Sequence, residues 1–276
     1  MSGTAVSRNY DGFVHKKPGF SWQYLLDDGV LGRMKAFNVL FSLLTVSSAA
    51  LAAESKPLLA VPGKVVFESK LDAVPAAPWK AAKGKWELVG GVWRGSEIPE
   101  DNHGAVIRLP NKLQDFVVEY EFKFEGARST SLSINALKDH MARIMITPAS
   151  VTIQRDDNDH EGPDKAVVFA RFATTLTPGV WHKVRLEMVG DAMVGQVNDL
   201  VAWGSSDLFK STKASPGFTV AGQSVDFRNL TICEASLNPG WEAAKASLPK
   251  PGEKVAPVAA PAGKGKGKAK GKKKAA

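Results

Sequence analysis

The sequence predicts an all-β fold in which two antiparallel sheets form a sandwich, and three observations support this prediction. Apolar and polar residues alternate with a period of two through many short runs between Lys64 and Ala235. Turn-forming pairs such as Gly90-Gly91 and Pro178-Gly179 separate these runs. No stretch between them has the length and the period of a helix. About a dozen strands without intervening helices are typical of a sandwich.

The clearest strand covers residues 115–124, DFVVEYEFKF. Apolar and aromatic residues fall at every second position from Phe116 to Phe124, so one face of this strand is buried and the other is wet. Shorter runs of the same kind are 64–69, 85–89, 92–95, 105–109, 131–137, 142–147, 151–154, 166–171, 182–189, 192–198, 217–221 and 224–232. In the last run the apolar positions change parity near Arg228-Asn229, which predicts a β-bulge there.

An export signal is predicted near the N-terminus. The basic flank of Arg33 and Lys35 precedes an apolar run over 36–46 and a small-residue stretch that ends in Ala50-Leu51-Ala52. These are the three parts of a secretory signal peptide, so we interpret residues 34–52 as the signal and residues 1–33 as an over-extended N-terminus. The mature protein is then periplasmic or extracellular, with no membrane span. The alternative is an uncleaved anchor helix.

The positive charge of the chain is concentrated at its C-terminus. The formal net charge is +8, and residues 249–276 carry nine lysines and one acidic residue, Glu253. The middle of the chain is therefore nearly neutral, which argues against a specific nucleic-acid-binding domain. The tail is rich in Pro and Ala and then in Lys, Gly and Ala, so we expect it to be disordered. It can bind a polyanionic surface polymer, or it can serve only solubility.

Four stretches of the sandwich region resemble a known family. They are WKAAKGKWELVGGVWRGSE (79–97), DFVVEYEFKF (115–124), PGVWHKVRLEMVGDAMVGQVND (178–199) and SVDFRNLTI (224–232). In this order they resemble the secreted 3-keto-disaccharide hydrolase domain, a member of the concanavalin A-like lectin/glucanase jelly rolls. The resemblance implies a jelly-roll domain over 60–236, a carbohydrate or glycoside as partner, and a binding site on the outward concave sheet face. Where family members carry Asn-Ser-Gly-Ile, this chain has Arg128-Ser129-Thr130-Ser131-Leu132.

Polar residues on the outward faces of the predicted strands are the candidates for ligand binding. The alternation that places their apolar neighbours in the core turns Asn135, Arg143 and Gln154 outward. Trp181 shares parity with outward charged residues and can stack on a sugar ring. We therefore expect Asn135, Arg143, Gln154 and Trp181 to bind substrate, although polar residues on a wet face need no function.

A dense acidic loop offers a second kind of site. Asp156 and His160 are candidates for catalysis, with His160 as a proton shuttle. Asp157, Asp159 and Glu161 have the spacing of the first half of a calcium loop, but the position of the final bidentate ligand is not acidic. We therefore expect no cofactor, and calcium is the option that this spacing leaves open. The alternative is a solvated hairpin loop.

The sequence leaves three functions open. The chain is a secreted glycosidic-bond hydrolase of the 3-keto-disaccharide type, a non-catalytic glycan-binding module, or a cell-surface interaction protein whose tail makes the contact. The fold alone does not decide between them.

The tail gives a testable prediction. Deleting residues 249–276 should abolish retention on an anionic matrix near physiological salt, because lysines alternating with Gly and Ala leave only charge for binding. Retention of the full chain should fall steeply with salt, since each neutralised anionic group releases about 0.9 counterions. Equal retention of the truncated and full chains would place the anion-binding surface in the sandwich instead.

Overall fold

The computed structural model describes residues 56–159, 161–162 and 165–253, and nearly all of its regular elements are strands, as the sequence predicts. The strands are β1 (Ala60–Ser69), β2 (Lys80–Lys83), β3 (Lys85–Val89), β4 (Val92–Ser96), β5 (Ala105–Arg108), β6 (Lys112–Leu113), β7 (Phe116–Asn135), β8 (His140–Thr147), β9 (Ser150–Arg155), β10 (Val167–Ala173), β11 (Trp181–Val189), β12 (Ala192–Val197), β13 (Leu200–Ser205) and β14 (Lys213–Leu237). The helices within these residues are η1 (Pro99–Asp101), η2 (Asp207–Lys210) and α1 (Trp241–Ala246). No helix in this part of the chain is long and apolar enough to cross a membrane.

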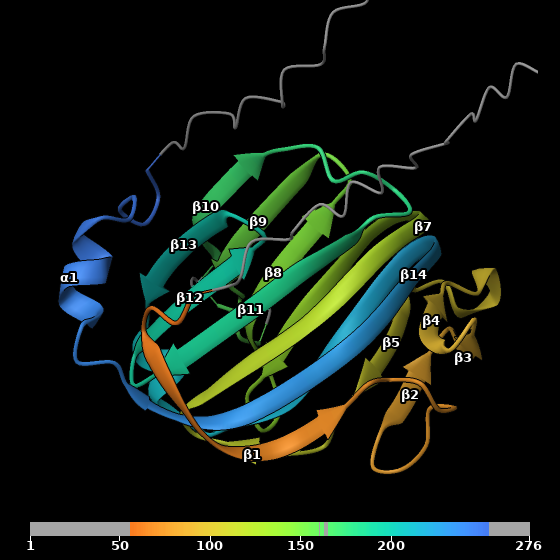
Figure 1. Cartoon of the computed structure of the whole chain (residues 1–276), viewed down its shortest axis with the longest axis horizontal. Coiled ribbons are helices and arrows are strands. Elements are labelled where there is room, and N and C mark those ends of the chain that lie inside the picture. Colours follow the sequence, from red (N-terminus) through yellow and green to blue (C-terminus); the bar gives the residue numbers. More distant parts are fainter. Residues whose placement is uncertain (1–55, 160, 163–164, 254–276) are drawn as a thin grey trace, which may run out of the picture. The chain divides into compact units, whose positions relative to one another are not determined.

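Two long strands, β7 and β14, pair antiparallel with each other and belong to both layers of the sandwich (Figure 1). The first half of β7 pairs with β11, and the sheet continues through β12 and β13. The second half of β7 pairs with β8, and that sheet continues through β9 and β10. On its other edge β14 pairs with β1, β4, β5 and β6. We call the first layer the β11 sheet and the second layer the β8 sheet.

The two long strands pass from one layer to the other at a pair of glycines. Gly126 in β7 has a φ of +89° and Gly222 in β14 has a φ of +92°, values that L side chains rarely adopt. The register of the pair shifts at this point. Glu97 fixes the bend, because its Oε2 accepts a 2.5 Å hydrogen bond from the Gly222 amide and a 2.9 Å bond from Arg128 Nη2.

The bend explains one difference from the sequence expectation. The sequence predicts four separate strands, over 115–124, 131–137, 217–221 and 224–232, where the structure has two continuous ones. Glycine lets each strand bend without leaving the ladder, so a turn-forming residue here does not end a strand. The predicted bulge in the last run is present, since the register shifts between Arg228 and Thr231 and Asn229 has a φ of +54°.

Aromatic side chains fill the space between the layers. Phe218 and Phe227, on the two halves of β14, stack with ring centroids 4.5 Å apart, and Tyr120 of β7 lies 4.7 Å from Phe218. All three side chains are almost fully buried. Burying a large apolar side chain stabilises the fold by about 1.5–3 kcal/mol, so this cluster couples the layers strongly.

The two ends of the described chain pack on the outside of the sandwich. Leu59 and Trp241 of α1 form a small apolar cluster with outward residues of the β11 sheet. The expected tail, 249–276, begins within the described part, where the Gly252 amide donates a 2.7 Å hydrogen bond to the Phe169 carbonyl of β10. A tail deletion that leaves this contact intact therefore starts at residue 254. The predicted signal, residues 34–52, and residues 254–276 lie outside the described residues.

The bend predicts the effect of a single methyl group. In Gly222→Ala the added Cβ would lie 2.9 Å from the Arg128 amide nitrogen, and the backbone would be held at positive φ. We expect a loss of about 1–3 kcal/mol in the free energy of unfolding, measured by chemical denaturation. Gly240→Ala is the matched control, because Gly240 has an ordinary φ of −83° and its Cβ would meet only Asn238 Oδ1 at 3.4 Å. Equal stability of the two variants would contradict this account of the bend.

Candidate functional site

The outer face of the β8 sheet carries a continuous row of mainly polar residues. Residues paired across antiparallel strands share a face, so the register defines the row. It runs from β2 through β5, β14, β7, β8 and β9 to β10. Its members, in that order, are Lys80, Arg108, Gly217, Ser133, Arg143, Gln154 and Val168.

The middle of this row is a floor of small residues between two arginines. The Arg108 side chain lies over Gly217, because a Cβ built on that glycine would sit 2.7 Å from Arg108 Cγ. Ser133 points outward and is nevertheless fully buried, so longer neighbouring side chains cover it. Arg108 and Arg143 are the long side chains on either side of this floor.

A second row lies beside the first and adds apolar surface. Its members are Val106, Thr219, Ser131, Met145, Thr152 and Arg171. The hydroxyls of Ser131 and Thr219 are 2.5 Å apart, which closes the floor with a hydrogen bond between neighbouring strands. Met145 is 38% exposed, and Val168 of the first row is 37% exposed. The face therefore combines fixed polar groups with apolar patches.

Arg143 and Gln154 converge on the carboxylate of Asp156. Asp156 follows β9 directly and is only 4% exposed. Gln154 Nε2 donates a 2.7 Å hydrogen bond to Asp156 Oδ1, and Arg143 Nη2 lies 3.3 Å from Asp156 Oδ2. The Asp156 amide bonds the Met141 carbonyl at 2.9 Å, so the backbone after β9 stays against β8. The three side chains hold one another in a fixed orientation.

Arg108 belongs to the same electrostatic group. Burial lowers the pKa of its guanidinium, the charge of Arg143 lowers it further, and Asp156 opposes both effects. Arg108 is not among the residues expected from the sequence, because nothing in its spacing shows that β14 and β7 bring β5 next to β8. Two guanidinium groups and one carboxylate give this surface both hydrogen-bond donors and acceptors.

Several polar atoms at this end of the face are buried without a hydrogen-bond partner among the described residues. They include Arg143 Nε, Asn135 Oδ1, Asn158 Oδ1 and Asp156 Oδ2, the last of which has the ion pair with Arg143 instead. Asn135 pairs with His140 at the start of β8, and the Asn158 carbonyl accepts a 2.9 Å bond from the His140 amide. A buried polar atom without a hydrogen bond costs roughly 1–3 kcal/mol of folding free energy, and a bound ligand or water molecule can supply the missing bond. The face therefore offers both donors and acceptors to a polyhydroxylated ligand.

Trp181 lies elsewhere. It faces outward, as its parity predicts, but on the β11 sheet, opposite Lys123 of β7. The Arg228 guanidinium covers its ring at 4.0 Å, and Lys123 Nζ lies 5.3 Å from its centroid. The structure thus brings Asn135, Arg143 and Gln154 to one face and leaves Trp181 on another.

The acidic loop is described only in part. His160 lies outside the described residues. Asp157 is half-buried, and Asp159 and Glu161 are exposed. Asp159 Oδ1 accepts a 2.9 Å hydrogen bond from the Glu161 amide, a local turn that explains the position of both residues. No group of three metal-ligating side chains forms within 56–159, 161–162 and 165–253.

No family model matches the chain, and no curated protein matches it in sequence. The resemblance to 3-keto-disaccharide hydrolases therefore rests on the sequence motifs. Solved structures do match. A Bacillus subtilis protein described as having unknown function and a galectin-like fold shares 11% identity, with 65% of this chain and 100% of that chain covered and a TM-score of 0.50.

Other solved structures show more distant similarity. The carbohydrate-binding module CBM66 from Bacillus subtilis is 17% identical, covers 56% of this chain and 95% of its own, and has a TM-score of 0.44. The laminarinase from Rhodothermus marinus is 10% identical, covers 64% of this chain and 99% of its own, and has a TM-score of 0.48. The chain is thus an all-β jelly-roll sandwich with a galectin-like fold.

Proposed function

We propose that this protein binds glycans on the outer face of the β8 sheet. The observation that carries the proposal is the convergence of Arg143, Gln154 and Asp156 beside a floor of small residues. Planar polar side chains held in one orientation can each bond adjacent hydroxyl groups of a sugar. Exposed Met145 and Val168 can contact the apolar C–H surface of the ring.

The number of buried carboxylates on this face favours binding without hydrolysis. Ordinary glycoside hydrolysis uses two carboxyl groups across the scissile bond. Within the described residues, Asp156 is the one buried carboxylate on the β8 sheet, and the other two buried carboxylates, Glu187 and Asp226, lie on the β11 sheet. We therefore place a binding module ahead of a two-carboxylate hydrolase. The predicted signal peptide supports action outside the cytoplasm, where polysaccharide ligands are found.

The second candidate function is cleavage of a 3-keto glycoside, which the family resemblance suggests. The Asp156 carboxylate beside Arg143 supports it, because chemistry next to a ketone needs one base and one group that polarises the carbonyl. Incubation with 3-keto and unmodified glycosides tests this activity. Cleavage of the glycosidic bond in the 3-keto glycoside but not in the unmodified one would favour the enzyme, provided that Asp156→Asn abolishes it. Glycan binding without cleavage would favour the module.

Arg143→Ala is the direct test of the glycan face. A glycan array identifies the ligand, and titration calorimetry then measures its affinity. Charge-assisted hydrogen bonds are worth about 1.5–3 kcal/mol, so we expect at least a tenfold weaker affinity.

The matched control for this test is Arg228→Ala. Like Arg143, Arg228 is partly exposed and paired with one carboxylate, but it lies on the β11 sheet. Its removal should leave glycan affinity unchanged. Unchanged affinity in a folded Arg143→Ala variant would reject the proposed face.

A further inference from the structure

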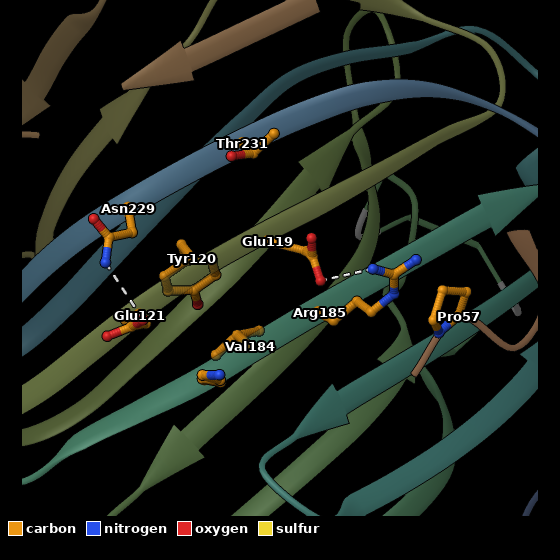
Figure 2. Close-up of a pocket in the computed structure, with 9 residues that line it drawn as sticks. Pro57, Glu119, Tyr120, Glu121, Val184, Arg185, Asn229 and Thr231 are labelled. Atoms are coloured by element: carbon orange, nitrogen blue, oxygen red, sulfur yellow. Dashed lines mark hydrogen bonds and ion pairs between the residues drawn. The ribbon is translucent and has the colours of Figure 1, made fainter. Parts of the chain in front are cut away.

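A separate pocket lies on the outer face of the β11 sheet. It has a volume of about 370 Å³ and is lined by side chains from β7, β11 and β14 and by Pro57 (Figure 2). This size falls in the range of small-molecule sites. The residues that line it with outward side chains are Glu119, Glu121, Lys183, Arg185, Asn229 and Thr231.

The carboxylates around the pocket already have donors from the chain. Glu121 accepts bonds from Arg228 Nε at 2.7 Å and from Asn229 Nδ2 at 3.4 Å. Glu119 accepts a 2.6 Å bond from Arg185 Nη1. The fully buried Glu187 beside the pocket accepts Arg185 Nε at 2.5 Å and the amides of residues 58–60. These acceptors do not call for a ligand.

Two cationic side chains at the pocket, Arg185 and Lys183, each have a donor atom without a partner in the ranges that the structure describes. Arg185 is only 2% exposed, and its Nη2 has no hydrogen-bond partner among the described residues. Figure 2 shows its guanidinium between Glu119 and Pro57. Lys183 is half-buried, and its Nζ makes no hydrogen bond or ion pair within the described part of the chain. Leaving the buried Arg185 Nη2 without an acceptor is costly, so an acceptor from outside the chain is expected there, and Lys183 Nζ is free to contact it as well.

The spacing of these donors indicates the acceptor. Lys183 and Arg185 are two residues apart on one face of β11, which separates their Cα atoms by about 6.6 Å along the strand. Both side chains are long enough for their charged ends to converge on one carboxylate, with charge-assisted bonds of about 2.8 Å to each. Thr231 and Asn229 on the β14 side of the pocket then face the rest of the ligand and suit hydroxyl groups.

We propose that this pocket is a second binding site, for a hydroxylated carboxylate of the size of one uronic acid residue. Its carboxylate bridges Lys183 and Arg185, and its hydroxyl groups meet Thr231 and Asn229. The site lies on the opposite layer from the Arg143 face, so it does not depend on the proposed glycan site. A chain with both sites can hold a neutral segment of a polysaccharide on one face and an acidic residue on the other.

Titration calorimetry with glucuronate, glucose and acetate tests the proposal on the full chain. Glucuronate should bind through Lys183, any binding of glucose should be independent of Lys183, and acetate should bind at least tenfold more weakly than glucuronate because it lacks the hydroxyl groups. Lys183→Gln should weaken glucuronate binding at least tenfold. This variant should fold normally, since Lys183 Nζ has no partner to lose.

Two controls separate this site from the other face. Lys80→Gln makes the same chemical change on the β8 sheet and should leave glucuronate affinity unchanged, as should Arg143→Ala. Glucuronate affinity that survives Lys183→Gln, or that falls with Arg143→Ala instead, would overturn the proposal. Absence of glucuronate binding, or equal binding of acetate, would overturn it as well. A fall of glucuronate affinity in Arg143→Ala would at the same time indicate sugar binding at Arg143, whereas the other outcomes leave the proposed glycan face untouched.

Discussion

β7 and β14 pair with each other through both layers of the sandwich, and every other strand is placed by this pair. The first half of β7 positions β11 to β13, and the second half positions β8 to β10. The passage between layers depends on Gly126 and Gly222, which take backbone angles that other residues adopt only under strain. The two outer faces on which the ligand sites lie are therefore products of one bent strand pair.

The two faces differ in how their charges are used. On the β11 sheet, most acidic and basic side chains neutralise each other across the strands, as in the pairs of Asp226 with Arg94 and of Glu121 with Arg228, and Arg185 Nη2 beside the pocket is a donor left over among the described residues. On the β8 sheet, Arg143 is paired with Asp156, the one buried carboxylate there in the described part of the chain, and the same charge acts on Arg108. Cross-strand ion pairs support the sheet itself, whereas charged and polar groups fixed on an outer face can also bind a ligand.

Period-two alternation predicted most of the strands and the faces of their side chains, but it missed β2, β6 and β13. Arg143 and Gln154 share a face because they flank a tight hairpin, and such local pairing follows from the turn at Thr147-Pro148. The grouping of Arg108 with Arg143, and the separation of Trp181 from both, depends on contacts between distant parts of the chain. Alternation tells inside from outside but does not tell which of two outer faces a residue occupies.

The central claim is that glycans bind beside Arg143, Gln154 and Asp156. The most direct test is NMR of the isotopically labelled protein, titrated with a neutral oligosaccharide that the glycan array identifies as a ligand. The account predicts that the side-chain signals of Arg143 Nε and Gln154 Nε2 and the amides of β8 and β9 shift together. The amides of β11 and β12 should stay in place. Shifts confined to the β11 sheet, with β8 and β9 unchanged, would contradict the account.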